Sequence, residues 1–193
     1  MKLKIKDIAD IQIGYQFRKK IEPVNDGTHA IIQMRDFDDN NNLNYRELSR
    51  VKLADLPDKY LVNKNDVLFL SRGHGNFAFA ITDSTESTIV ASYFFILRIR
   101  SNKILPEYLA WYINQAPAQG YLYNIARRGT HMPLVPKSAF ENLKVHITDI
   151  QTQKSIVELN SLFDKEKELI RKLQEKRSLL IRSISIKAAK KSN

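Results

Sequence analysis

Cysteine is absent from this chain of 193 residues, which excludes both a disulfide framework and a thiolate cage for a metal ion. Long apolar runs are also missing. The longest, such as 77–81 and 93–97, are far shorter than the ~20 residues that span a membrane. Residues 1–6 alternate charged and apolar side chains, so they lack the continuous hydrophobic segment of a signal peptide. We therefore expect a cytoplasmic protein that does not associate with membranes.

Acidic residues are in the minority. The chain has 31 Lys and Arg against 21 Asp and Glu, a formal net charge of +10. The excess is concentrated in residues 150–193, which hold 11 basic and 5 acidic side chains. A positive field attracts polyanions, so nucleic acid is the expected class of partner, and a merely solubilising surface is the alternative.

The first 149 residues show the pattern of a mixed α/β domain. Apolar or alternating runs predict strands at 66–71, 77–81, 93–100 and 143–147. Helices are predicted over 106–113, with Pro106 in the first turn, and over 118–127. The Asp- and Asn-rich stretch 36–44 predicts a loop. The predicted fold class is an α/β domain over 1–149, a mixed sheet with short helices, followed by a long C-terminal coiled-coil helix over 150–193.

The C-terminal segment has the seven-residue periodicity of a coiled coil. Between 152 and 188 there is no Pro or Gly, and apolar residues recur in alternating steps of three and four. At 1.5 Å per residue the helix is about 55 Å long, and its apolar seam needs another helix. The seam residues are Ile156, Leu159, Phe163, Glu166, Ile170, Leu173, Arg177, Leu180 and Ile184.

The two charged seam residues predict the direction of the partner. In an antiparallel pair of copies whose facing residue numbers sum to 343, Glu166 faces Arg177 of the other copy. Leu159, Phe163 and Ile170 then face Ile184, Leu180 and Leu173. In a parallel pair Glu166 would face Glu166 and Arg177 would face Arg177, and both contacts are repulsive. We therefore favour antiparallel self-association. Packing of the helix on its own domain or on a different protein is the alternative.

The chain carries no recognisable catalytic machinery. It lacks a P-loop, a glycine-rich cofactor turn and the Asn-Pro-Pro-aromatic signature of amino-methylating enzymes. The four histidines are scattered without metal-ligand spacing, and the polar turn 71–75 lacks the G-x-S-x-G elbow. We predict a non-catalytic chain with neither a metal site nor a cofactor of its own.

Polar, basic loops beside aromatic residues are the candidates for contact with DNA. Arg, Lys, Asn and Gln side chains on a rigid scaffold read base edges and bind phosphates, and neighbouring glycines allow close approach. An ordinary solvated turn is the alternative for each loop. The candidates lie in 14–20, 33–35, 71–76 and 127–131, and they are Gln16, Arg18, Lys19, Gln33, Arg35, Arg72, His74, Asn76, Arg127, Arg128, Thr130 and His131.

The order of these segments resembles the specificity (S) subunit of type I restriction–modification systems. Tyr60–Gly73 is similar to the family's K-x-G-D-I-L-F-S-R-x-G, with Asn65 at the position of its glycine. Ile5–Arg18, Ile31–Phe37 and Ala126–Leu134 resemble the family's opening, its next strand and loop, and the end of its recognition domain. Residues 143–156 resemble the strand and the EEQ-x-x-I start of the spacer helix, although 147–150 replace a proline-rich turn.

The resemblance implies a subunit that binds double-stranded DNA while separate methyltransferase (M) and restriction (R) subunits perform methylation and cleavage. S-adenosylmethionine would belong to the M subunit, which would dock on the helices. A full S subunit carries two recognition domains and two antiparallel helices, so one copy of each implies a half-subunit. It would pair as an antiparallel homodimer or with another half-subunit, and the pair would read two inverted half-sites.

Other functions remain open at this stage. One is a stand-alone DNA-binding regulator, which would co-purify with no methyltransferase. Another is a coiled-coil scaffold without sequence-specific DNA binding, which a salt-resistant preference for one DNA sequence would exclude. The third is an unrecognised enzyme.

Overall fold

The structure is a computed structural model, and it describes residues 1–18, 20–38, 41–54, 56–73, 75–83, 87–126 and 132–191. The chain divides into two compact units, Met1–Gln153 and Lys154–Asn193. The long helix begins at Ile150. The boundary expected at 149/150 therefore coincides with the start of this helix, while the first compact unit also includes its first turn.

Short strands predominate in the first hundred residues, and among the described residues every α-helix except a short one at 5–8 begins after residue 105. The strands are β1 Lys2–Lys4, β2 Ala9–Ile13, β3 His29–Ile32, β4 Ser49–Val51, β5 Val67–Leu70, β6 Ala78–Ala80, β7 Thr88–Val90, β8 Phe94–Ile99 and β9 Lys144–His146. The helices are α1 Ile5–Ile8, α2 Pro106–Ile113, α3 Ala116–Ile125, α4 Lys137–Phe140 and α5 Ile150–Lys191, with 3-10 turns η1 Met34–Asp36, η2 Tyr45–Glu47 and η3 Asp58–Tyr60.

This arrangement confirms the predicted fold class of a mixed α/β domain with a long C-terminal helix. The predicted strands 66–71, 77–81, 93–100 and 143–147 correspond to β5, β6, β8 and β9, and the predicted helix 106–113 is α2. The second helix, α3, lies slightly N-terminal to the expected 118–127. Its first turn contains Pro117, and proline is favourable there because the first helical N–H groups have no partner within the helix.

The central sheet has the strand order β2-β8-β5-β6, with antiparallel neighbours throughout. Both faces of β5 and β8 are buried. Leu68 and Ile96 pack on one side, while Phe69 and Phe95 face Phe140 of α4 on the other. The rings of Phe69 and Phe140 stack at 4.1 Å. Burial on both faces explains why these strands read as continuous apolar runs in the sequence.

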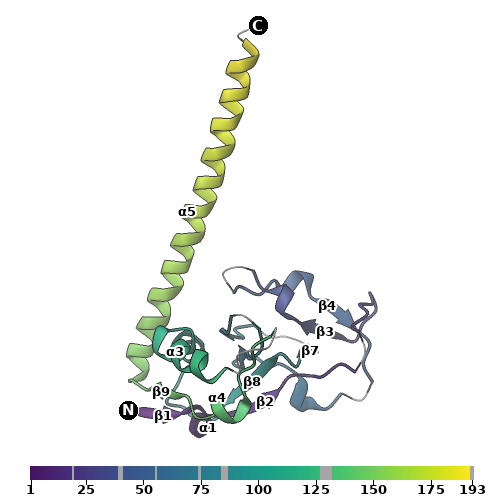
Figure 1. The fold of residues 1–193 in the computed structure, drawn as a ribbon, viewed down its shortest axis with the longest axis vertical. Helices are drawn as coiled ribbons and strands as arrows, with labels where there is room; N and C mark the ends of the chain where they lie inside the picture. The colour runs from purple at the N-terminus through teal and green to yellow at the C-terminus, as the bar shows by residue number, and fades with distance from the viewer. Residues whose placement is uncertain are drawn as a thin grey trace. The chain divides into compact units, whose positions relative to one another are not determined.

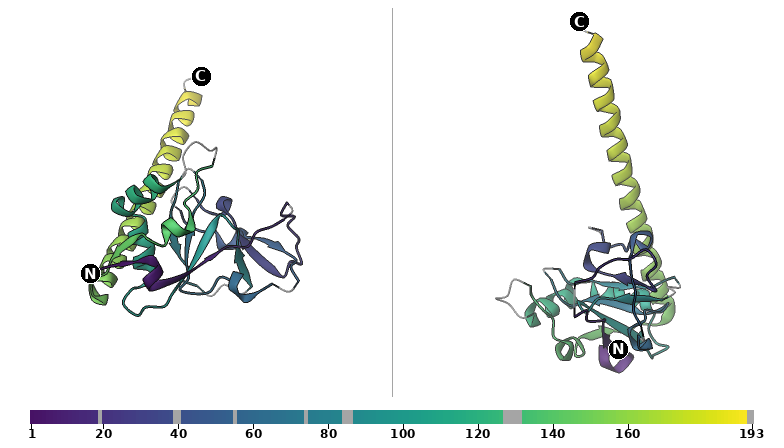
Figure 2. Two further views of the ribbon diagram at one scale, coloured as in Figure 1. Left: turned by 60° about the horizontal axis from the view of Figure 1, so that its bottom comes forward. Right: turned by 90° about the vertical axis from the view of Figure 1, so that its right-hand side faces the viewer.

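A second sheet, of order β4-β3-β7, lies at one end of the first unit (Figures 1 and 2). Here β3 runs antiparallel to β4 and parallel to β7. Ile31 and Ile89 are fully buried in it. The N-terminal strand β1 pairs with β9 at the opposite end of the unit. The segment just before the long helix is thus tied to the start of the chain.

The edge strand β6 is completed by a side chain instead of another strand. Asn114, at the C-terminus of α2, accepts a hydrogen bond from Ala78 N (2.7 Å) and donates to Ala78 O (2.9 Å). The carboxamide pairs with the backbone as a neighbouring strand does, so these two backbone groups are satisfied. The contact fixes the end of α2 on the central sheet.

The long helix α5 is capped and anchored at its first turn. Asp149 accepts hydrogen bonds from Thr152 N (2.8 Å) and Thr152 Oγ1 (2.7 Å), and these bonds lower the pKa of its carboxyl. The Gln153 side chain is fully buried. It donates to Lys103 O (2.8 Å) and Thr148 O (2.9 Å) and accepts from Leu105 N (2.9 Å). These contacts fix the start of the helix at Ile150.

Replacing Gln153 with methionine should keep the volume of the side chain and remove the partner of three partly buried backbone groups. We expect a loss of about 3 kcal/mol in the free energy of unfolding. Urea unfolding of the full chain, followed by the fluorescence of its single tryptophan, Trp111, measures it. The exposed neighbour Gln151 provides the control, since its replacement with methionine should change stability by less than about 0.5 kcal/mol. Equal losses from both variants would contradict the anchor.

Candidate nucleic-acid interface

The segment after β2 is held against the loop between β7 and β8. Gly14 N donates to Phe94 O (2.9 Å), and Tyr15 N donates to Val90 O (2.7 Å). A Cβ at Gly14 would collide with the carbonyl oxygens of Val90 and Ala91, so this approach requires glycine. The polar residues that follow Tyr15 are thereby placed beside residues 90–93.

The segment after β5 is fixed to the same loop. Ser71 N and Ser71 Oγ both donate to Tyr93 O at 2.8 Å. Gly73 N donates to Pro133 O (3.0 Å), and the φ of Gly73 is +127°, a conformation that other residues rarely adopt. The 71–73 segment is thus pinned between Tyr93 and the chain just after 127–131.

Residues 33–35 complete the cluster. The methyl carbon of Met34 lies 3.2 Å from the position that a Cβ at Gly73 would take. Ala91 N donates to Ile32 O (3.0 Å), which links the end of β3 to the same loop. Segments 14–18, 33–35, 71–73 and 90–93 therefore meet, and we call them the loop corner.

The exposed side chains of the loop corner are mainly polar. Gln16 and Arg18 are exposed. Arg35 is exposed and donates to Ser49 Oγ (2.9 Å). Gln33 is half-buried, and its Nε2 is buried with no hydrogen-bond partner among the described residues. An unpaired buried donor is costly, and because this nitrogen is buried it is not exposed to an approaching ligand.

The candidates of the 71–76 loop differ in what they do. The exposed Arg72 places its guanidinium over the ring of Tyr93, 5.6 Å from the centroid. Asn76 is half-buried, and its Nδ2 donates to Leu70 O (2.8 Å), which closes the turn after β5.

Six predicted contacts lie outside the described residues: Lys19, His74, Arg127, Arg128, Thr130 and His131.

Burial changes the titration of two groups near β3. It raises the pKa of the Asp36 carboxyl, against the opposing effects of the hydrogen bond from Gln33 N (2.7 Å) and the charge of Arg35. It also raises the pKa of Tyr45 to about 12, with the charge of Asp83 adding to the effect. At neutral pH the Tyr45 hydroxyl therefore stays protonated. Asp36 holds the turn after β3 by accepting from the backbone of Gln33.

Tyr93 belongs to the corner although the sequence pattern did not single it out. The strand predicted over 93–100 begins at Phe94, which leaves Tyr93 in the turn with 37% of its surface exposed. An aromatic residue that starts a run of buried ones gives no sign of exposure by itself. Its place in the loop corner follows only from the hydrogen bonds that Ser71 donates to the carbonyl oxygen of Tyr93.

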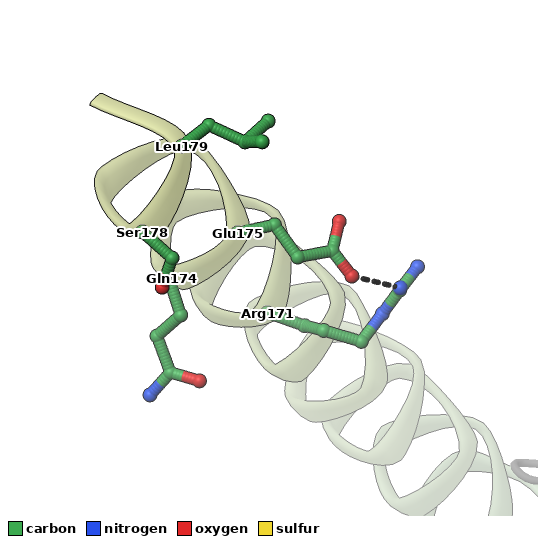
Figure 3. A pocket seen from close by; sticks show the side chains of 5 residues that line it. All are labelled: Arg171, Gln174, Glu175, Ser178 and Leu179. Carbon is green, nitrogen blue, oxygen red and sulfur yellow. Dashed lines mark hydrogen bonds and ion pairs between the residues drawn. The ribbon is translucent and has the colours of Figure 1, made fainter. Parts of the chain in front are cut away.

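Among the described residues, no group of three or more His, Cys, Asp or Glu side chains is placed to hold a metal ion. The described helices are all too short or too polar to cross a bilayer. A depression on the surface of α5 is lined by Arg171, Gln174, Glu175, Ser178 and Leu179 (Figure 3). All of these residues come from one helix, and Arg171 and Glu175 form an ion pair at 2.6 Å. This solvated helix surface brings no distant residues together.

The apolar seam of α5 is uncovered from Leu159 to Ile184, while Ile156 is half-buried. Its large apolar residues are 49% to 67% exposed; they are Leu159, Phe163, Ile170, Leu173, Leu180 and Ile184. Among the described residues, neither Glu166 nor Arg177 has an ion-pair partner, whereas their neighbours form pairs along the helix such as Asp164–Lys167. The two charges of the seam are thus unpaired, and its apolar residues face solvent.

The chain matches one family across nearly its full length. The family model for the type I restriction modification DNA specificity domain matches residues 1–176. No curated protein sequence matches the chain.

Several solved structures share the fold. The type I restriction-modification system S subunit from M. genitalium is 16% identical, with a TM-score of 0.60 over 87% of this chain and 40% of that one. The HsdS subunit from Thermoanaerobacter tengcongensis is 15% identical, with a TM-score of 0.59 over 86% and 37%. A third structure, described as the structural basis of complex assembly and conformational transition of the type I R-M system, is 14% identical, with a TM-score of 0.60 over 91% and 41%. The chain thus spans about two-fifths of the length of these proteins.

Proposed function

Because the chain belongs to the family of type I restriction–modification DNA specificity domains, we propose that it is a sequence-specific DNA-binding subunit. It directs methyltransferase and restriction subunits to a bipartite DNA site and performs no chemistry itself. S-adenosylmethionine then binds to the methyltransferase subunit. The family match over residues 1–176 carries this proposal.

One local feature supports the alignment with the family's K-x-G-D-I-L-F segment. Asn65 stands where the family has glycine, and its φ is +73°. This left-handed region is adopted readily by glycine and tolerated by asparagine. The substitution therefore preserves the turn that leads into β5.

We propose that the loop corner is the surface that faces DNA. Its described cations are Arg18, Arg35 and Arg72, and Arg72 stands in a segment that backbone hydrogen bonds fix to Tyr93 and to residues 133–135. Guanidinium groups bind phosphates as bidentate donors and read guanine in the major groove. A rigid backbone under these side chains favours base readout, because less conformational entropy is lost when DNA binds.

The helix supports antiparallel pairing of two copies. The register that places Glu166 opposite Arg177 also places Ile170 opposite Leu173 and Phe163 opposite Leu180, so the exposed apolar residues cover one another. A buried charge pair adds little net stability, but it disfavours the wrong register and the parallel pair. Two-fold symmetry then presents the two recognition domains to inverted half-sites.

A second face of α5 supports docking of a partner subunit. With Phe163 and Ile170 at heptad position a and Leu173 and Leu180 at d, positions g and c between 162 and 186 hold no carboxylate. They are Leu162, Lys165, Leu169, Lys172, Lys176, Leu179, Ser183 and Ile186, which we call the g/c face. Its four large apolar side chains are 48% to 67% exposed. A two-stranded coiled coil needs only a and d, and a wider apolar arc is typical of a helix with two helical neighbours.

The charges of the g/c face indicate the chemistry of the partner. Self-association through this face would bring lysine against lysine, which is unfavourable. An amphipathic helix with acidic flanks would instead cover the leucines and pair with Lys165 and Lys176, which have no ion-pair partner among the described residues. Lys172 already pairs with Glu168 of the same helix. We assign this face to the docking of the methyltransferase subunit.

Selection of bound fragments from random DNA tests the function. We expect the full chain to enrich an interrupted inverted repeat, and the preference to persist as salt is raised. The experiment is repeated with the methyltransferase subunit present, which should tighten binding to the same repeat. Enrichment of no sequence, or binding that vanishes uniformly with salt, would overturn the proposal.

A charge swap tests the antiparallel register. Glu166→Arg should raise the dimer dissociation constant by about tenfold or more, because two arginines then face each other twice in the dimer. Adding Arg177→Glu should restore part of the affinity, since the pair is re-formed with its charges exchanged. Analytical ultracentrifugation measures both. Glu158→Arg, at an exposed position outside the seam, is the control and should leave the dimer intact. Absence of rescue in the double variant would contradict this register.

A peptide of about 28 residues, with four leucine heptads flanked by glutamates, tests the g/c face. We expect it to bind the dimer better than a lysine-flanked peptide, and Lys165→Glu with Lys176→Glu to weaken it by about tenfold. Lys154→Glu with Arg182→Glu makes the same change of charge at position f, away from this face, and should have little effect. Equal binding of both peptides would exclude the acidic partner. Loss of DNA binding in the first variant alone would assign the face to DNA instead.

A further inference from the structure

Arg72 is held by its backbone on two sides. Ser71, on one side of it, donates twice to Tyr93 O at 2.8 Å. Arg72 itself forms an antiparallel bridge with Leu134, and Val135 N donates to Ser71 O (2.8 Å). Of the described candidates for DNA contact, Arg72 is the one in a segment bonded to two neighbouring chain segments at once. Its Cα is therefore fixed before any ligand arrives.

The side chain of Arg72 is oriented without being neutralised. Its guanidinium carbon lies 5.6 Å from the centroid of the Tyr93 ring. Among the described residues, no carboxylate or carbonyl accepts a hydrogen bond from it. Arg35, by contrast, donates to Ser49 and lies 3.9 Å from Asp36. Arg72 thus keeps all its side-chain donors, whereas Arg35 already bonds Ser49 and lies beside the Asp36 carboxylate.

An aromatic ring under a guanidinium leaves the N–H edge of the group free. The attraction between the cation and the ring face restricts the side chain, because the plane of the group is held over the ring. When the guanidinium plane lies parallel to the ring, its in-plane N–H groups point away from the ring. Two such donors match the O6 and N7 acceptors of guanine in the major groove, and this is the most common specific contact between proteins and DNA.

We propose that Arg72 reads a guanine in each half-site and that Tyr93 is the positioning residue that orients it. This inference rests on the proposed function and names one base of its target. The Tyr93 ring acts through its face, so the hydroxyl is dispensable. The positive φ of Gly73, +127°, fixes the turn that directly follows Arg72.

The test compares base preferences in bound-fragment selections with the full chain and its variants. Arg72→Ala and Tyr93→Leu should both lose the preference for guanine at one position of each half-site and keep the other positions. Tyr93→Phe should retain that preference. We expect the discrimination at this position to fall by about tenfold or more. Replacing that guanine with 7-deazaguanine should weaken wild-type binding but not binding by Arg72→Ala.

The outcomes separate this inference from the proposed function. A wild-type chain that selects no sequence would overturn both. A wild-type preference that Arg72→Ala weakens uniformly, with every position kept, would make Arg72 a phosphate contact and overturn the guanine assignment alone. Unchanged selection by Tyr93→Leu would remove the positioning role. Arg182→Ala, an exposed arginine of α5, is the control and should preserve all base preferences, while thermal unfolding verifies that every variant is folded.

Discussion

The uncovered apolar seam of α5 is the constraint on which the proposed assembly depends. A helix of 42 residues with a row of half-exposed Leu, Ile and Phe side chains gains free energy when that row is covered. If a second copy covers it, the protein is a dimer with two-fold symmetry. The same symmetry requires the two half-sites on the DNA to be inverted. The direction of pairing then depends on two residues, Glu166 and Arg177, whose charges are repulsive in any parallel arrangement.

In the first compact unit, the main structural requirement is a fixed backbone under the polar loops. The loop corner is assembled from segments far apart in sequence, and backbone hydrogen bonds hold it more than side chains do. The side chains at its surface can consequently be replaced by others of different chemistry while the backbone of the loop corner keeps its shape. Within this frame, one arginine is oriented by an aromatic ring and another is engaged by a serine and a carboxylate. Similar residues thus have unequal capacity for a new partner.

The sequence predicted those elements whose pattern is local. Continuous apolar runs identified β5 and β8, and the heptad repeat identified α5. The pairing of β3 with β7 and of β1 with β9 was not predicted, because these strands are three or four residues long and their partners are distant in the chain. The candidate loops were chosen by composition alone. That criterion found Arg72, but it did not reveal Tyr93 or the role of Asn76 in closing its own turn, since both depend on contacts that only the fold creates.

Among the described residues, the buried side-chain amide of Gln153 bonds to main-chain atoms of Lys103, Leu105 and Thr148. Every residue except proline carries the same backbone donor and acceptor, so this anchor tolerates any side chain at Lys103 and Thr148 and any side chain but proline at Leu105. During evolution the side chains around the start of α5 can therefore change, and a different DNA-binding domain can be joined to this helix. The condition is that the backbone that bonds Gln153 keeps its course. Side chains can thus change the DNA sequence that is preferred, while backbone atoms preserve the connection between the first unit and α5.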